Sequence, residues 1–404
     1  MTSETVAERT RDVLRQALAE GDGILRLAPA FVARDWVPSG RRLGLPDDQY
    51  AVGERGEICE RWLASTTRAA NRISPAGEGL SFLDLAGADR VALTDVVDAA
   101  PEAIMGAAYA ATHDGLGRLA KIFDYGERVP YHIHPRAEHA ALLGRKPKDE
   151  AYYFLPGVGM GKHPESFFGV HPWIVDRRRQ DVLVPYLEAW DSDEILKFAQ
   201  GALLVQEEGF HIPSGILHAP GTALTLELQE DSDVLCMLQA KVGDTIISKE
   251  LLYKESTAEA RARLGERCVL ELVDWAANGD PYFWQNHHLS PQLIRSSVQP
   301  GGEEYWIYYG TSKFTGKKLV VRAGETYRTV EHGVYGIFVW RGMGRFGGHE
   351  VAGGVHGRDE LLVTHDRAIR PIEVENTGGD ELLIVKFFGP DINPDVPTIA
   401  EVAG

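Results

Sequence analysis

The chain has 404 residues, of which 44% are hydrophobic and 25% are charged, and its formal net charge is −17. A chain of this length can form two or three domains with sizeable cores. The negative charge disfavours nucleic acids and anionic membrane surfaces as partners, because both bind basic protein faces. Small molecules, or a second copy of the chain in a homodimer, are therefore the expected partners.

The three cysteines indicate a reducing compartment. Cys59, Cys236 and Cys268 have no CxxC spacing, so the sequence predicts neither a disulfide framework nor a thiolate metal site. The N-terminus is charged rather than apolar, and no apolar run reaches the length of a membrane span. We expect a cytoplasmic protein that does not enter the membrane.

The predicted elements begin with an amphipathic helix over residues 5–19, where apolar residues recur at helical spacing before the turn at 21–23. Short apolar runs divided by Gly and Pro then continue to about Ala240, which predicts an all-β sandwich or barrel. Residues 248–278 lack Pro and are rich in helix-forming residues, and strand signals return after Pro281. The chain thus divides into a first β unit with an N-terminal extension, a helical insertion and a second β unit, over residues 1–247, 248–283 and 284–404.

Four residues of the first β unit have the types and the spacing of a metal site. His132 and His134 are alternate residues of an expected strand, so both imidazoles can reach one ion. Glu150 begins the next strand, and His218 follows a tight turn at 213–215. Nitrogen and oxygen ligands without thiolate suit one divalent metal ion. Zinc is the first expectation, and Mn, Fe, Co and Ni stay open.

The spacing resembles the two cupin motifs. The first, GxxxxxHxH with ExxxxxxG, is matched from Gly126 to His134 and from Glu150 to Gly157, and the second, PxGxxH, from Pro213 to His218. The resemblance implies a mainly β bicupin, that is, two jelly-roll β-barrels with an N-terminal helix and a helical insertion. In the second unit Val330 and His332 stand at the HxH positions and no Glu follows on the next strand, so we expect a degenerate cupin without metal.

A narrower resemblance covers roughly the first 240 residues. In order, the blocks GEICERWLAST, LGRLAKIFDYGERVPYHIHP, KPKDEAYYFL, FHIPSGILHAPG and LTLELQEDSDV are similar to type I mannose-6-phosphate isomerases. In that family a metal-binding cupin interconverts an aldose and a ketose through a cis-enediol, and a Lys-x-Glu element precedes the ligand strand, as Lys148-Asp149-Glu150 does here. The resemblance implies ligands at His134, Glu150 and His218, while His132 stands where the family often has Gln.

Three residues near the ligand segments are candidates for the proton transfer. Removing a proton beside a carbonyl builds negative charge on oxygen, which a divalent cation stabilises, and a base must then move the proton. Lys148 ranks first because it lies two residues before Glu150, and Glu227 and His211 follow. Each has an ordinary alternative: a solvated loop lysine, a glutamate on an exposed strand face and a histidine that caps a turn.

The leading prediction is a metal-dependent aldose–ketose isomerase that acts on a small carbohydrate. The family has an arginine for the substrate phosphate soon after the metal half, where Cys236 and Met237 stand here, so a sugar and a sugar phosphate are both open. Two other functions also stay open: an oxygenase or decarboxylase of the Mn or Fe bicupin type, and a non-catalytic sugar-binding cupin.

Overall fold

The computed structural model describes residues 3–85 and 90–403 of a chain that is mainly β, which confirms the predicted class. Within these ranges the strands form sheets of eight, seven, five, four and two strands, and all the strand pairs are antiparallel. None of these sheets closes into a barrel in the described ranges. The interpretation as a bicupin therefore stays a prediction.

The sheets are built as follows, each in its order of hydrogen-bonded neighbours. The eight-stranded sheet contains β17 (Gln292–Leu293), β18 (Gly302–Tyr308), β19 (Thr315–Val321), β26 (Leu382–Phe388), β21 (Tyr335–Arg341), β24 (Glu360–Val363), β1 (Ile24–Ala28) and β4 (Phe82–Leu83). The seven-stranded sheet contains β16 (His288–Leu289), β10 (Gly209–Ile212), β7 (Glu150–Phe154), β12 (Thr225–Gln229), β5 (Leu119–Phe123), β3 (Glu57–Leu63) and β2 (Ala30–Arg34). The five-stranded sheet contains β13 (Cys236–Met237), β6 (His132–Ile133), β11 (His218–Ala219), β8 (Glu165–Phe168) and β9 (Gln200–Leu203). The smaller sheets contain β20 (Thr326–Thr329), β25 (Ile372–Asn376), β22 (Met343–Phe346) and β23 (His349–Ala352), and β14 (Lys241–Val242) with β15 (Thr245–Ile246).

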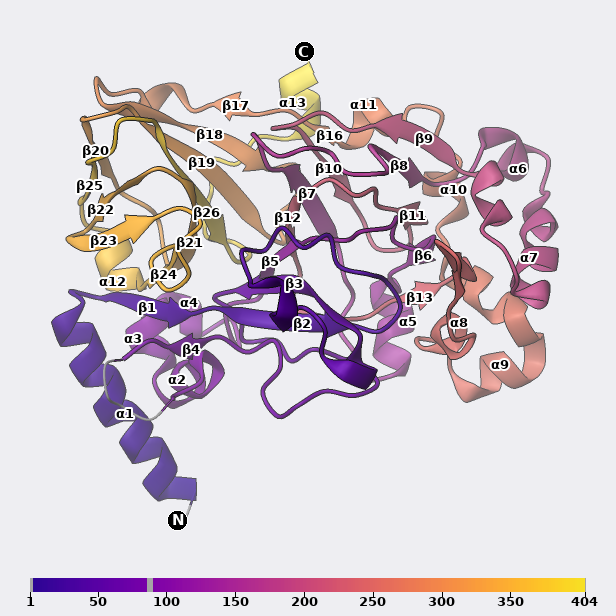
Figure 1. Cartoon of the computed structure of the whole chain (residues 1–404), viewed down its shortest axis with the longest axis horizontal. Helices are drawn as coiled ribbons and strands as arrows, with labels where there is room; N and C mark the ends of the chain where they lie inside the picture. The colour runs from indigo at the N-terminus through magenta and orange to yellow at the C-terminus, as the bar shows by residue number, and fades with distance from the viewer. Residues whose placement is uncertain (1–2, 86–89, 404) are drawn as a thin grey trace.

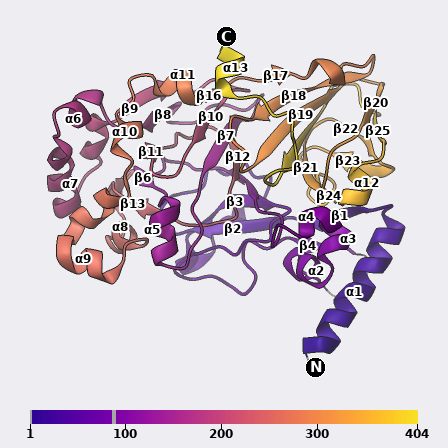
Figure 2. The same cartoon turned by 180° about the vertical axis from the view of Figure 1, so that it is seen from behind.

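The α-helices are short except for the first. They are α1 (Ser3–Glu20), α2 (Leu93–Ala99), α3 (Pro101–Met105), α4 (Ala107–Ala110), α5 (Ala137–Leu142), α6 (Pro172–Asp176), α7 (Val184–Ala189), α8 (Glu250–Tyr253), α9 (Ala258–Leu264), α10 (Trp275–Asn278), α11 (Phe283–His287), α12 (His365–Ala368) and α13 (Ile399–Ala403). Helices α8 to α10 lie in the predicted helical segment, and α6 to α9 cover the end of the molecule next to the five-stranded sheet (Figures 1 and 2). No helix in the described ranges is both long and apolar enough to cross a membrane.

The predicted N-terminal helix is present as α1, which buries Leu14 and Ala17. The strand that follows it, β1, pairs with β24 of the eight-stranded sheet, with Ile24 opposite Val363. The first strand of the chain thus belongs to a sheet whose other long strands come from the second β unit. The division of the chain at residue 247 stays a prediction. The pairing of β1 with β24 joins the two predicted units in one sheet.

The seven-stranded sheet lies in the middle of the molecule and is buried on both faces (Figure 1). On β7, Tyr152 and Phe154 pack in one core with residues of the five-stranded sheet such as Phe168. The alternate residues Ala151 and Tyr153 pack in the other core, with the eight-stranded sheet. Because side chains alternate along a strand, one strand can contribute to both cores. The seven- and five-stranded sheets therefore face each other, and Glu150 points into the space between them.

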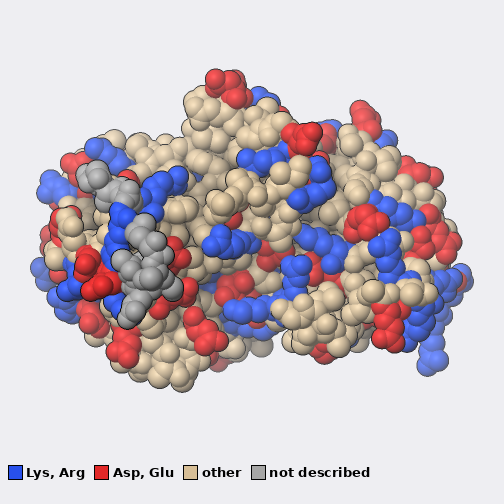
Figure 3. Space-filling model, turned by 90° about the horizontal axis from the view of Figure 1, so that it is seen from below, with Lys and Arg blue, Asp and Glu red and all other residues tan. Residues whose placement is uncertain are grey.

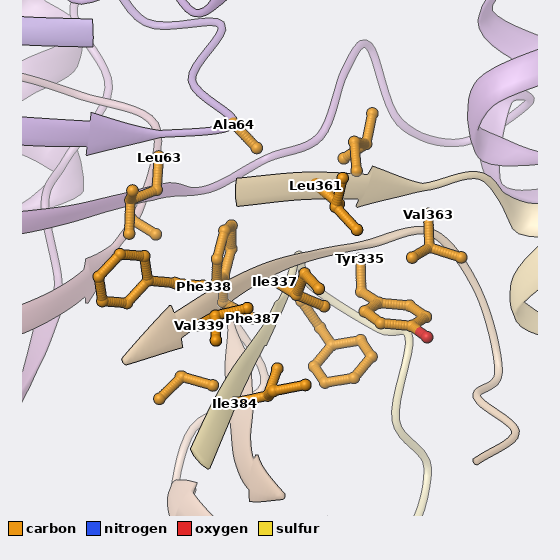
Figure 4. Packing of buried hydrophobic residues seen from close by; sticks show 14 of the residues in the cluster. Leu63, Ala64, Tyr335, Ile337, Phe338, Val339, Leu361, Val363, Ile384 and Phe387 are labelled. Carbon is orange, nitrogen blue, oxygen red and sulfur yellow. The ribbon is translucent and has the colours of Figure 1, made fainter. Parts of the chain in front are cut away.

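The junction between the two halves contains both apolar packing and buried charge. Leu63 and Ala64, at the end of β3, lie beside Phe338 and Leu361 of the eight-stranded sheet (Figure 4). Next to them the buried Arg61 guanidinium donates to both carboxylate oxygens of Asp359, at 2.6 and 2.7 Å, and to Glu360 at 3.0 Å.

On the surface, by contrast, basic and acidic residues are interspersed, as the face in Figure 3 shows.

Candidate metal centre

The four predicted ligands converge in the structure. His132 lies on β6, His134 directly follows it, Glu150 begins β7 and His218 begins β11. Antiparallel pairing places His218 opposite His132, while Glu150 approaches from the facing seven-stranded sheet. One ligand atom from each of the four buried residues lies within 4.8 Å of every other. We call these residues the His/Glu quartet.

Each imidazole of the quartet is oriented by a backbone carbonyl. The Nδ1 atom of His132 lies 2.8 Å from the Pro130 carbonyl, that of His134 lies 2.6 Å from the Val234 carbonyl, and that of His218 lies 2.9 Å from the Ile216 carbonyl. A carbonyl only accepts, so each Nδ1 carries the proton and each Nε2 keeps its lone pair. This is the arrangement by which proteins orient metal-ligating histidines.

The quartet fits a metal ion because its inward atoms have no other satisfactory partner. The Nε2 atoms of His134 and His218 are buried and make no hydrogen bond, although they lie 3.1 and 2.9 Å from the Glu150 carboxylate. Leaving such atoms unpaired costs about 1–3 kcal/mol each. Three imidazole nitrogens and one carboxylate form a donor set that suits a divalent transition metal.

The turn before His218 explains why a glycine is needed there. Gly215 has a φ of +87°, a left-handed conformation that other residues rarely adopt. Its N–H donates to the carbonyl of His134 at 2.8 Å, which ties the turn to the strand of the first two ligands. The predicted Pro-Ser-Gly turn is thus confirmed as the element that positions His218.

Burial and neighbouring charges favour the metal-binding protonation states of His132, His134 and Glu150. Burial lowers the pKa of His132 well below its usual value and lowers the pKa of His134 to about 3, so both are neutral at pH 7. Burial alone would raise the pKa of Glu150, but the neighbouring charges, above all the Lys148 ammonium, lower it. The Tyr152 hydroxyl also donates to its carboxylate.

Lys148 and Glu227, two of the three catalytic candidates, lie beside the quartet. The Lys148 Nζ is 2.7 Å from Glu150 Oε2 and 3.1 Å from Glu227 Oε1. Burial opposes the charge of Lys148, but the two carboxylates outweigh it and raise its pKa. Burial, together with the nearby Glu150 charge, raises the pKa of Glu227 to about 7. A charged lysine and a readily titratable carboxyl group therefore face one another at this site.

His211, the third candidate, lies elsewhere. On β10 it sits opposite Ala151, whereas its neighbour Ile212 sits opposite Glu150. Its Nε2 is 3.7 Å from Asp149, and its ring centroid is 6.4 Å from that of Phe314 in the second β unit. The structure thus places His211 on the other side of the strand from the quartet, outside the lining of the adjoining cavity.

Glu150, Lys148 and Glu227 belong to a longer row of buried charges, and the sequence prediction missed its other four members. Lys121 lies directly opposite Glu227, with 3.3 Å between their charged atoms, and 3.8 Å from Glu60. Glu60 in turn pairs with Arg34 at 2.6 Å, and Arg34 pairs with Asp233 at 3.1 Å. We call the row from Glu150 to Asp233 the charge ladder; it contains Glu150, Lys148, Glu227, Lys121, Glu60, Arg34 and Asp233. The only signal in the sequence was a charged residue inside an apolar run, such as Lys121 in LAKIF.

The quartet and the charge ladder border one cavity. It is lined by members of both groups and by aromatic side chains, including Trp36, Phe123, Tyr125 and Tyr152. Trp36 is half-buried, whereas the other three are buried. The site therefore combines a candidate metal-binding cluster, titratable side chains and apolar walls around one cavity.

Comparison with known proteins extends the resemblance from motifs to the whole fold. No protein-family model matches the sequence, and no curated protein matches it either. Among solved structures, the chain is similar to the mannose 6-phosphate isomerase from Bacillus subtilis, with a TM-score of 0.62 and 15% identity over 90% of this chain and 99% of that one. A mutant of the phosphomannose isomerase from Salmonella typhimurium gives a TM-score of 0.61 with 12% identity over 91% of this chain and 100% of that one. The chain therefore has the fold of the solved mannose 6-phosphate isomerases, as the motifs predicted.

Proposed function

We propose that the protein is a metal-dependent aldose–ketose isomerase that acts on a sugar or sugar phosphate through a cis-enediolate. The observation that carries the proposal is the convergence of the His/Glu quartet beside the buried Lys148–Glu227 pair. An isomerase of this kind needs both parts, because one stabilises an oxyanion and the other moves a proton. The fold shared with mannose 6-phosphate isomerases supports the same chemistry.

We assign His132, His134, Glu150 and His218 as the ligands of one divalent ion. Zinc is the first candidate, and Mn, Fe, Co and Ni also suit a set of imidazoles and one carboxylate. When bound, the ion would supply positive charge that stabilises the developing oxyanion of the substrate. With only one carboxylate among its ligands, the loaded quartet carries a net positive charge, which favours an anionic enediolate over a neutral sugar.

Glu227 and Lys148 share the proton transfer in this proposal. Two carboxylates hold the Lys148 ammonium in its charged form, which suits a group that orients Glu227 for the proton transfer. Glu227 faces the same cavity and suits the base that carries the proton between adjacent carbons. This assignment reverses the order in which the sequence ranked the two residues, and it gives His211 no catalytic role.

The division into units belongs to the same proposal. We propose that residues 1–247 form the metal-binding cupin and residues 284–404 a degenerate second cupin, joined by the helical insertion over 248–283. The two facing sheets around the His/Glu quartet and the helices of the insertion support this organisation.

The proposal is tested with the zinc- or manganese-loaded protein in deuterated water, using mannose, glucose and their 6-phosphates. We expect deuterium at C2 together with ketose formation, and loss of both when a chelator removes the metal. Oxygen uptake or release of carbon dioxide would instead indicate an oxygenase or decarboxylase. Tight sugar binding without deuterium exchange would indicate a sugar-binding protein. Either result would contradict the proposal.

A further inference from the structure

The charge ladder bears on the kind of sugar that the cavity can take. Three cationic side chains line the cavity, Arg34, Lys121 and Lys148, and all three are buried. A sugar phosphate carries up to two negative charges, and proteins bind such groups with arginines, lysines or backbone N–H groups that are free to donate. The partners that these three cations already have therefore bear on whether the cavity can hold a phosphate.

Arg34 has no free donor. Its Nε and one Nη2 hydrogen donate to Glu60 at 2.6 and 3.0 Å, and the other Nη2 hydrogen donates to Asp233 at 3.1 Å. Its Nη1 group donates to Asn71 at 2.8 Å and to Asp233 at 3.3 Å. A guanidinium has five N–H groups, and these five contacts use all of them. A phosphate could bind Arg34 only by displacing a buried carboxylate.

Each lysine of the ladder lies between two carboxylates. Lys148 is 2.7 Å from Glu150 and 3.1 Å from Glu227, and Lys121 is 3.3 Å from Glu227 and 3.8 Å from Glu60. The three cations are thus outnumbered by four carboxylates, Glu60, Glu150, Glu227 and Asp233, all of which line the cavity. The carboxylates that flank each ammonium and the guanidinium would repel a phosphate dianion brought next to them.

The rest of the cavity wall suits a neutral polyhydroxy compound. Trp36, Phe123, Tyr125 and Tyr152 provide apolar surface, and the Phe123 and Tyr125 rings stack with centroids 5.0 Å apart. Sugars pack their C–H faces on such rings, while carboxylates accept hydrogen bonds from sugar hydroxyls. Among these carboxylates Glu227 is the available acceptor for a hydroxyl group of an unmodified sugar, because its Oε1 makes no hydrogen bond.

We propose that the cavity selects an unphosphorylated aldose or ketose and rejects its phosphate ester, an inference that rests on the proposed isomerase function. The selection comes from the charge ladder, in which each cation is already neutralised by carboxylates. Asp233 is the residue whose removal would release Arg34 most directly, because it accepts two of the five guanidinium contacts.

The test compares mannose with mannose 6-phosphate, and glucose with glucose 6-phosphate, on the metal-loaded protein. Turnover is followed by ketose formation and binding by calorimetry. We expect kcat/KM for the free sugar to exceed that for its phosphate by roughly tenfold or more, and inorganic phosphate not to compete with the free sugar. Equal or better use of the phosphorylated sugar, or competitive inhibition by phosphate, would overturn this inference and leave the isomerase proposal standing. If no sugar of either kind is isomerised, the isomerase proposal fails and this inference fails with it.

A variant tests the origin of the selection. Asp233→Asn should raise kcat/KM for the phosphorylated sugar relative to the free one by severalfold, because it returns donors of Arg34 to the cavity. Asp231→Asn is the matched control, since Asp231 pairs with the exposed Lys146 instead. An unchanged ratio in a folded Asp233→Asn protein would show that the ladder does not set the preference. If that variant does not fold, the comparison of the four sugars on the unmodified protein still decides the inference.

Discussion

Replacing Lys148 by methionine separates metal binding from proton transfer. Methionine has a similar length and no charge, so the change removes both ion pairs of the ammonium and little volume. Lys148 is 4% exposed, and its Nζ lies 2.7 Å from Glu150 and 3.1 Å from Glu227. Removing one partner of such a buried cluster costs about 3–5 kcal/mol. We expect the metal-free variant to lose stability by that amount, because two carboxylates remain with only Lys121 nearby.

The same substitution should leave the metal in place. In the metal-free protein the Lys148 ammonium and an incoming ion compete for the Glu150 carboxylate, so loss of the ammonium makes the quartet more negative and more attractive to a cation. Turnover should nevertheless fall about a hundredfold to ten-thousandfold, which is the contribution of a positioned proton-transfer group. Metal content after dialysis, measured by mass spectrometry, and deuterium exchange at C2 together test both expectations.

Lys146→Met is the control for Lys148→Met. Lys146 lies two residues earlier, its side chain is 63% exposed and it pairs with Asp231 at 2.8 Å. Its replacement should change neither metal content nor turnover, because an exposed ion pair contributes little. Full turnover in Lys148→Met would refute the role assigned to this lysine. Loss of the metal would refute the view that Lys148 and the ion compete for Glu150.

The other predictions concern the ligands and the stability of the fold. His134→Ala and Glu150→Ala should each lose the metal on dialysis, and full occupancy in both would disprove the ligand assignment. Arg61→Ala should lower the free energy of unfolding by about 3–5 kcal/mol, because it leaves Asp359 and Glu360 buried without their partner. Denaturant titration measures this loss, with Arg358→Ala, at an exposed arginine, as the control. Burial would raise the pKa of Glu60, but Arg34 and Lys121 lower it to about 2. Because the pKa of Glu60 in the folded protein lies below the usual value of about 4.5, this carboxylate should add about 3 kcal/mol to the free energy of unfolding above pH 4.5. This contribution should disappear as the pH falls towards 2. Denaturant titrations over a pH series should show this loss of stability in the unmodified protein and not in Glu60→Gln.

The quartet could be predicted from the sequence because each of its residues stands in a local pattern. Alternation along one strand places His132 and His134 on the same side, and the first residue of a strand and a glycine turn place Glu150 and His218. The structure keeps all of these local features, so the motif was sufficient to find the residues. Lys148 was found for the same reason, since it lies two residues before a ligand.

The charge ladder could not be found in this way, because it depends on strand register. Glu227, Lys121, Glu60 and Arg34 lie on β12, β5, β3 and β2, which are consecutive strands of one sheet but far apart in the sequence. Only the pairing of these strands shows that acidic and basic side chains alternate across the sheet. His211 was misjudged for a related reason, since the sequence does not show which side of β10 faces the quartet. The pairing of β1 with β24 was hidden in the same way, as no local pattern indicates a partner more than 300 residues away.

Buried charges in the two halves of the molecule are satisfied in different ways. In the second half, the Lys386 ammonium donates to Glu304 at 2.8 Å and to Glu331 at 2.7 Å, and Lys317 donates to Glu331 at 2.6 Å. The positive charges of the two lysines balance the negative charges of the two glutamates, so this cluster needs no ligand. In the His/Glu quartet, by contrast, the Nε2 atoms of His134 and His218 are buried without a hydrogen bond. A buried polar cluster that does not satisfy itself needs a bound group to do so. The difference supports the proposal that the metal site lies in the first half.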